Sequence, residues 1–245
     1  GWRATPPNLP LGRPRGLGIL LDGRYGQDLL DRVTGTGLWV ARPIEAPGSR
    51  PLRFDGMRDL GSALREWPGE QVVKCLCFYH PDDAAMLRAA QEQTLLAVDE
   101  AARRTGHELL LEIIPSRGDG PAGPDTLARA LANIYALGIR PDWWKLPSPG
   151  GQEGWDALAQ VIAANDRFCR GVLVLGLDAP EEELARDLAL AARQPVCMGF
   201  AVGRTIFGEP AASWFAGTIG DEEAVARMAS SFARLVETYE RAAAQ

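Results

Sequence analysis

Lysine is almost missing from this chain of 245 residues. Only two of its 26 basic residues are lysines, Lys74 and Lys145, and all the others are arginines. Both lysines lie inside apolar, strand-like runs. An arginine is effectively always protonated, whereas a lysine can lose its proton and act as a nucleophile. The composition therefore favours a chemical role for the two lysines. The alternative is that they stand there by chance, with their ammonium groups reaching solvent along a flexible stem.

Patterns typical of metal sites are missing as well. The chain has two histidines and no Cys-x-x-Cys pair, so we expect no metal site. The four cysteines lie within or beside apolar runs, at Cys75, Cys77, Cys169 and Cys197. This placement predicts reduced, small core residues in a cytoplasmic protein.

Several classes of protein are excluded by other absences. No apolar run is long enough to span a bilayer, and no signal-peptide pattern is present. The net charge of -6 argues against a nucleic-acid partner. There is no Gly-x-Gly-x-x-Gly after the first apolar run and no Walker motif, so neither dinucleotide nor P-loop chemistry is supported.

What the chain does contain is a regular alternation of apolar runs and amphipathic stretches. A proline-rich segment, residues 1–16, reads as an N-terminal arm or linker, and residues 17–245 read as one domain. Seven apolar runs are predicted to be strands, at 17–22, 38–43, 72–79, 108–114, 141–147, 171–177 and 196–204. Helices are predicted between them, and a final one at 222–241. Asp82 or Asp83 is expected to cap the helix that stops before Gly106, and a loop at 118–124 is expected before a helix at 125–137 that Gly138 closes.

This order predicts an α/β fold with a parallel sheet, in which strands are apolar throughout because both faces are covered. Polar residues recur inside or at the ends of several strands, as they do in the active sites of TIM-type (β/α)8 barrels. We count seven strands where a closed barrel needs eight. The first strand is therefore absent, or the arm supplies a substitute.

The run around Lys145 is bounded by Pro141 and Pro147. Alternation along a strand puts Trp143 and Lys145 on one face. Burial beside tryptophan removes water from the ammonium group, so the pKa of Lys145 should fall and its free amine should become available.

Lys74 and Glu112 lie on strands that neighbour this run in sequence order. If both point into the barrel, the carboxylate and the ammonium can pair, and the remaining lysine has its pKa lowered further. The carboxylate is then available for proton transfer. A purely structural buried ion pair is the alternative.

The last apolar run ends in Gly203 and Arg204. Glycine lets the backbone approach a ligand closely, and arginine matches phosphate oxygens with its two-pronged guanidinium. Gly176, at the end of the preceding run, is expected to contribute neighbouring amides. Barrels often bind phosphate after their last two strands, although Gly-Arg alone also fits an ordinary turn.

Five segments in this order resemble a known family. They are Ile19-Leu-Leu-Asp-Gly-Arg-Tyr-Gly26, Val73-Lys-Cys-Leu-Cys-Phe-Tyr-His-Pro-Asp82, Leu111-Glu-Ile-Ile-Pro115, Pro141-Asp-Trp-Trp-Lys145 and Gly199-Phe-Ala-Val-Gly-Arg-Thr-Ile-Phe207. Together they resemble the 2-deoxy-5-keto-D-gluconate-6-phosphate aldolase domain of myo-inositol catabolism, which is related to class I tagatose-1,6-bisphosphate aldolases. The resemblance covers about residues 17–240.

The resemblance implies roles for particular residues. Lys145 would form the imine, Lys74 and Glu112 would be the supporting charged pair, and Gly203 and Arg204 would hold phosphate. Glu45 would match a further active-site carboxylate. The family's first strand ends in Phe-Asp-His-Arg, which has no counterpart here. Asp22 is kept as a candidate catalytic carboxylate, although it belongs to the family's next strand.

The resemblance thus implies a cytoplasmic lyase of carbohydrate metabolism that needs neither cofactor nor metal. Its substrate would be a phosphorylated sugar acid, cleaved to dihydroxyacetone phosphate and malonate semialdehyde. An aldolase for another phosphorylated ketose, and a non-catalytic sugar-phosphate-binding barrel, remain as alternatives. The family's domain is often fused to a sugar kinase, so a fused or paired kinase is the expected partner. Self-association into a homo-oligomer is left open.

Overall fold

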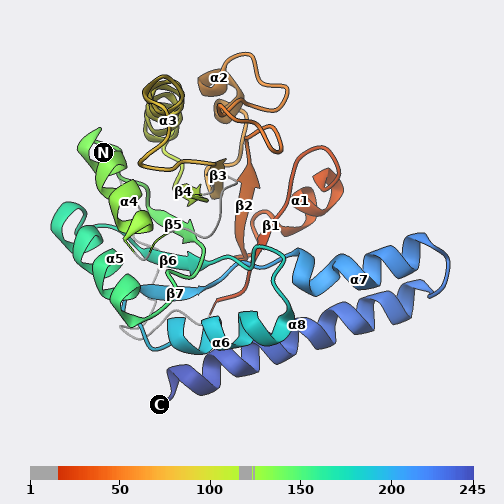
Figure 1. The fold of residues 1–245 in the computed structure, drawn as a ribbon. Helices are drawn as coiled ribbons and strands as arrows, with labels where there is room; N and C mark the ends of the chain where they lie inside the picture. Colours follow the sequence, from red (N-terminus) through yellow and green to blue (C-terminus); the bar gives the residue numbers. More distant parts are fainter. Residues whose placement is uncertain (1–15, 116–122, 124) are drawn as a thin grey trace.

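A computed structural model describes residues 16–115, 123 and 125–245. Seven parallel strands follow one another through the chain (Figure 1): β1 (Gly18–Leu20), β2 (Trp39–Pro43), β3 (Gln71–Cys77), β4 (Leu109–Ile113), β5 (Trp143–Leu146), β6 (Gly171–Val174) and β7 (Cys197–Phe200). The helices between and after them are α1 (Gln27–Val33), α2 (Leu60–Arg65), α3 (Ala85–Thr105), α4 (Thr126–Ala136), α5 (Gln152–Asn165), α6 (Glu181–Ala191), α7 (Arg204–Phe215) and α8 (Asp221–Ala243).

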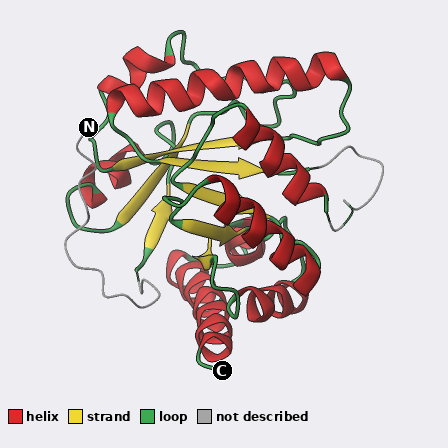
Figure 2. Cartoon of the chain, turned by 90° about the vertical axis from the view of Figure 1, so that its left-hand side faces the viewer, coloured by secondary structure: helices red, strands yellow, loops and turns green. Residues whose placement is uncertain are grey.

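The strands form one sheet in the order β1 to β7, and every neighbouring pair is parallel. Within the described residues β7 does not pair with β1, so the sheet is a half-barrel whose two edges stay open. Helices surround its outer side (Figures 1 and 2). The predicted α/β fold with a parallel, barrel-type sheet of seven strands is confirmed, and the arm that was considered as a substitute for a first strand lies, apart from Gly16, outside the described residues. All strands run in one direction, so the segments after Lys145 and before Arg204 leave the sheet at the same end.

The two faces of the sheet bury different residues, which explains why the strands are apolar throughout. The outer face packs against the helices through side chains such as Val73, Cys75 and Trp144. The inner face carries a small separate cluster built on Ala41, Val72, Leu110 and their neighbours. The predicted core placement holds for Cys75, Cys77 and Cys197, which are buried, whereas Cys169 is half-buried.

Two predicted element boundaries are wrong. Asp82 and Asp83 do not cap α3, which begins at Ala85. Asp83 instead accepts a hydrogen bond from the backbone N–H of His80 and pairs with Arg50, so its carboxylate is already used.

The last strand is also shorter than predicted. It ends at Phe200, and Arg204 is the first residue of α7, a helix that the sequence did not predict. Pro210 lies inside this helix and disguised it, because proline usually breaks helices. The expected arm, apart from Gly16, and most of the predicted loop 118–124 fall outside the described residues.

Candidate active site

Three of the predicted residues meet on the inner face of the sheet. In the strand register, Glu112 on β4 lies opposite Lys145 on β5 and opposite Leu76 on β3. Lys74 lies two residues before Leu76 and therefore shares its face of the sheet. Lys145 Nζ donates to Glu112 Oε1 at 2.9 Å, and Lys74 Nζ forms an ion pair with Glu112 Oε2 at 2.8 Å. The side chains of Lys74, Glu112 and Lys145 are only 9%, 6% and 12% exposed. Glu112 therefore bridges the only two lysines of the chain.

Glu45 extends this cluster from the segment that follows β2. An antiparallel bridge between Glu45 and Phe54 folds this segment back on itself. Lys74 Nζ donates to Glu45 Oε1, and the Glu45 side chain is 8% exposed. The other oxygen, Oε2, is buried and has no hydrogen-bond partner among the described residues. Glu45 was predicted to contact substrate, and the structure places it in direct contact with Lys74.

Within this cluster the pKa values of the two lysines shift in opposite directions. Burial lowers the pKa of Lys145, and the positive charge of Lys74 lowers it further, although Glu112 opposes both effects. Burial also acts against the charge on Lys74, but Glu112 and Glu45 together outweigh it, so the pKa of Lys74 is raised. Burial of Glu112 is likewise outweighed by its two lysines, and its pKa is lowered. The predicted fall in the pKa of Lys145 is thus confirmed.

Apolar side chains lie next to Lys145 on the inner face. Leu173 is its register partner on β6, and Trp143 precedes it by two residues on β5. Trp143 packs edge-to-face on Trp39, with ring centroids 5.9 Å apart, and both belong to the inner apolar cluster. These side chains exclude water from one side of the ammonium group, which is why burial dominates its pKa.

Asp22 is used differently from what was predicted. Its Oδ1 accepts hydrogen bonds from the backbone N–H groups of Arg24 and Tyr25, both at 2.8 Å, so it shapes the turn after β1. Within the described part of the chain, Asp22 makes no hydrogen bond or ion pair with the lysines or with Glu112. The structure does not bring it into the charged cluster.

The predicted phosphate-binding residues lie where the chain leaves β6 and β7. Gly203 precedes the first turn of α7, and the Arg204 guanidinium is 3.2 Å from Asp178 Oδ2. A side chain at Gly176 would come within 3.1 Å of Val202, so glycine lets the two loops approach each other. Thr205 Oγ1 also donates to the carbonyl of Ala179. No recorded contact within the described residues joins these loops to the lysine cluster.

Asp178 is a residue that the sequence did not single out. Leu177 and Asp178 both adopt positive φ, 47° and 65°, which is unusual for residues other than glycine. An aspartate tolerates this region better than leucine. Asp178 and Arg204 are far apart in the sequence, and no sequence pattern indicated that they would form an ion pair.

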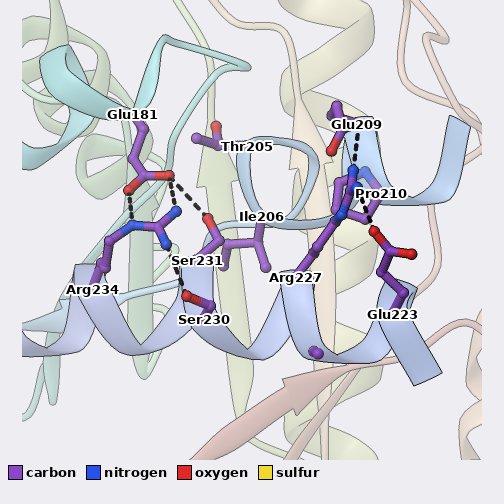
Figure 3. Close-up of a pocket in the computed structure, with 11 residues that line it drawn as sticks. Glu181, Thr205, Ile206, Glu209, Pro210, Glu223, Arg227, Ser230, Ser231 and Arg234 are labelled. Atoms are coloured by element: carbon purple, nitrogen blue, oxygen red, sulfur yellow. Dashed lines mark hydrogen bonds and ion pairs between the residues drawn. The ribbon is translucent and has the colours of Figure 1, made fainter. Parts of the chain in front are cut away.

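A groove of about 500 Å³ lies elsewhere, between α6, α7 and α8 (Figure 3). Its charged groups are paired with one another: Arg234 holds both carboxylate oxygens of Glu181, and Arg227 contacts Glu223 and Glu209. Neither lysine lines this groove. We therefore place the candidate active site at Lys145.

Two general features of the described residues complete the picture. No group of three or more His, Cys, Asp or Glu side chains in the described ranges is arranged to hold a metal ion. No helix in the same ranges is long and apolar enough to cross a membrane.

The sequence matches, over residues 6–243, a family described as an uncharacterized protein conserved in bacteria (DUF2090). The chain belongs to the DUF2090 family. No curated protein matches it.

The fold of this DUF2090 chain is similar to several solved structures, which include two aldolases. Fructose-bisphosphate aldolase from Plasmodium falciparum matches with a TM-score of 0.64 and 13% identity, over 92% of this chain and 76% of that one. Cgl0159 from Corynebacterium glutamicum matches with a TM-score of 0.60 and 19% identity, over 92% and 72%. An archaeal fructose-1,6-bisphosphate aldolase, whose catalytic Lys is covalently bound to the carbinolamine intermediate, matches at 0.55 and 15%, over 77% and 71%. At these identities the likeness concerns the fold.

Proposed function

We propose that this chain is a class I aldolase that forms a Schiff base through Lys145. The observation that carries the proposal is the buried lysine of lowered pKa, held against Glu112 on the inner face of a parallel half-barrel. A neutral amine in this position attacks a ketone and forms an iminium ion, which then acts as an electron sink. The similarity in fold to an archaeal aldolase with a covalently bound catalytic Lys supports the same chemistry.

We further propose 2-deoxy-5-keto-D-gluconate 6-phosphate as the substrate, on the strength of the five ordered segments described above. The imine would form at the C5 ketone, and the bond between C3 and C4 would break. The C3 hydroxyl loses its proton as malonate semialdehyde leaves, and the remaining enamine is reprotonated and hydrolysed to dihydroxyacetone phosphate. Arg204 and the backbone at Gly203 and Gly176 would hold the phosphate.

A non-catalytic sugar-phosphate-binding barrel is the second candidate. The observation that favours it is that no contact within the described residues joins the predicted phosphate-binding loops at Gly176 and Arg204 to the lysine cluster.

Trapping with borohydride separates the two candidates. Incubation with dihydroxyacetone phosphate and borohydride should add one three-carbon adduct to Lys145. The adduct should disappear in Lys145→Arg, which keeps the charge but loses the nucleophile. An adduct on Lys74 would exchange the roles of the lysines. The absence of any adduct on either lysine would contradict the aldolase and favour the binding barrel. Release of dihydroxyacetone phosphate from the proposed sugar acid, but not from tagatose 1,6-bisphosphate, tests the substrate.

A further inference from the structure

The four buried charged groups of the site form one continuous network of contacts. Lys145 Nζ contacts Glu112 Oε1, Glu112 Oε2 contacts Lys74 Nζ, and Lys74 Nζ donates to Glu45 Oε1. Both oxygens of Glu112 are therefore within 2.9 Å of a lysine nitrogen. The second oxygens of both carboxylates, Glu112 Oε2 and Glu45 Oε2, are buried and accept no hydrogen bond among the described residues. Glu112 Oε2 still has its ion pair with Lys74, whereas no ion pair within the described residues reaches Glu45 Oε2. A buried carboxylate oxygen without a partner is costly when charged, and it becomes less so when it carries a proton.

The charges within this four-residue network must stay balanced, because an unpaired buried charge is strongly unfavourable. Two lysines and two carboxylates sum to zero when all are ionised. Lys145 must be neutral to attack a carbonyl, and the cluster would then carry one excess negative charge. Protonation of one carboxylate restores neutrality. Glu112 and Glu45 then share the charge of Lys74, but Glu112 still accepts a hydrogen bond from Lys145, so Glu45 is the less stabilised carboxylate of the two.

We propose that Glu45 is the proton acceptor that lets Lys145 become a nucleophile and returns the proton when the imine forms. The proton moves along the existing contacts in an order that keeps every group chemically possible. Lys74 first gives a proton to Glu45, Lys145 gives one to Glu112, and the protonated Glu112 carboxyl group turns and passes its proton to the neutral Lys74. The result is a neutral amine on Lys145 and a carboxylic acid on Glu45, while Glu112 and Lys74 regain their starting charges. This inference rests on the proposed aldolase function and assigns one of its steps.

The protons balance over the whole step. The neutral amine adds to the ketone to give a carbinolamine, with the amine proton passing to the new hydroxyl. Glu45 then returns its proton along the same chain, and the hydroxyl leaves as water. The carbon–nitrogen double bond forms as an iminium ion, and Glu45 is again a carboxylate. No other proton donor is needed.

Glu45 interacts electrostatically with Lys74 and Cys75 on β3 and with Lys145 on β5, and Glu112 on β4 is linked to it through Lys74. The thiol of Cys75 has its pKa raised well above its ordinary value by burial, so it stays neutral. Any change of charge near Glu45 is therefore a change on the two lysines or on Glu112.

Infrared spectroscopy tests which carboxylate holds the proton, and it does so without relying on catalysis. In Lys145→Met the cluster permanently lacks one positive charge, and the proposal places the compensating proton on Glu45. We expect a protonated carboxyl band in this variant, and a shift in its position in Lys145→Met combined with Glu45→Asp, because the band then comes from a different side chain. Absence of the band from the folded single variant would overturn the proposal. So would an unmoved band in the double variant, which would place the proton on Glu112.

Borohydride trapping with dihydroxyacetone phosphate provides the kinetic test. Loss of general acid–base catalysis typically costs at least about 100-fold, so trapping by Glu45→Gln at neutral pH should slow by about that factor. Glu45→Asp keeps a carboxylate and should recover part of the rate. Glu92→Gln is the matched control, because Glu92 pairs with Tyr79 outside the cluster and its loss should change nothing.

The two tests also separate this inference from the aldolase itself. Trapping in the unmodified chain together with an unchanged rate in Glu45→Gln would overturn the role of Glu45 alone. Absence of trapping in the unmodified chain would overturn the aldolase, while the infrared result would still decide where the proton lies. Circular dichroism of each variant confirms that the comparison is made on folded protein.

Discussion

The two lysines differ because each has a different number of carboxylate neighbours. Lys74 contacts both Glu45 and Glu112, which stabilise its charged form. Lys145 contacts Glu112 only, and Glu112 is shared. Burial is similar for both, so the unequal number of partners decides that Lys74 keeps its proton and Lys145 gives it up more readily.

Lys74→Met should shift the pH dependence of imine trapping. The charge on Lys74 lowers the pKa of Lys145, and Glu112 would then pair with Lys145 alone. Both changes favour protonated Lys145, so its pKa should rise and the midpoint of trapping should move to higher pH. Lys74→Arg keeps the positive charge and should shift the midpoint less. An unmoved midpoint in Lys74→Met would contradict the electrostatic coupling of the two lysines.

Arg204→Ala should weaken binding of the phosphorylated substrate. A charge-assisted hydrogen bond contributes about 1.5–3 kcal/mol, so KM should rise at least about tenfold with a smaller effect on kcat. Arg65→Ala removes an arginine at the end of α2, far along the chain from Arg204, and serves as the control. Equal KM values for Arg204→Ala and the unmodified chain would remove Arg204 from the phosphate site.

At the residue scale, the sequence predicted the Lys74–Glu112–Lys145 contacts because strand alternation and parallel order determine which side chains share a face. It did not predict that Glu45 would contact Lys74, since this depends on how the segment after β2 folds back at Phe54. Asp22 was included because it ends an apolar run. A local turn uses its carboxylate instead, and alternation carries no information about such turns.

At the scale of the elements, strand β5 packs against helix α4 on its outer face and presents Lys145 on its inner face. Trp144 is fully buried, packs edge-to-face on Tyr135 of α4 and donates its indole N–H to the tyrosine oxygen at 2.8 Å. Strand β5 has only four residues, so this anchor has a large share in fixing the strand.

Trp144→Phe should destabilise the fold while leaving the chemistry intact. It keeps an aromatic ring but removes the hydrogen bond to Tyr135, a loss of about 1 kcal/mol plus a contribution from reduced packing. Denaturant unfolding should report the lower stability, and borohydride trapping on Lys145 should continue. Stability equal to that of the unmodified chain would show that the bond does not contribute.

The ends of helices were predictable from the sequence where a glycine marked them. Gly106 adopts φ of 78° at the end of α3, and Gly138 adopts 86° just after α4, so glycine stopped both helices as expected. Helix α7 was missed because its apolar start continues the preceding strand run and Pro210 interrupts its pattern. The start of α3 was misplaced because Asp83 bonds within the preceding turn.

At the scale of the whole molecule, β1 and β7 are the edge strands of the half-barrel among the residues that the structure describes. The three residues of β1 are exposed or half-buried, whereas the residues of β3 and β4 are almost all buried. Edge strands have fewer backbone partners than central ones, so their local stability is lower.

Amide hydrogen exchange should follow this gradient. Amides of β1 should exchange fastest among the strands, those of β7 next, and those of β3, β4 and β5 most slowly. Peptide-resolved exchange measured by mass spectrometry checks the order. Protection of β1 equal to that of β4 would show that another segment covers this edge in solution.

The near-absence of lysine also has a consequence for chemical probes. Aldehyde reagents condense with neutral amines and leave guanidinium groups untouched. On this chain they would find two lysine side chains, one of which is held charged by two carboxylates. Lys145 would then be the preferred side-chain target. The mass of the intact protein after mild labelling would count the reactive amines, with the chain's own terminal amine as the remaining background.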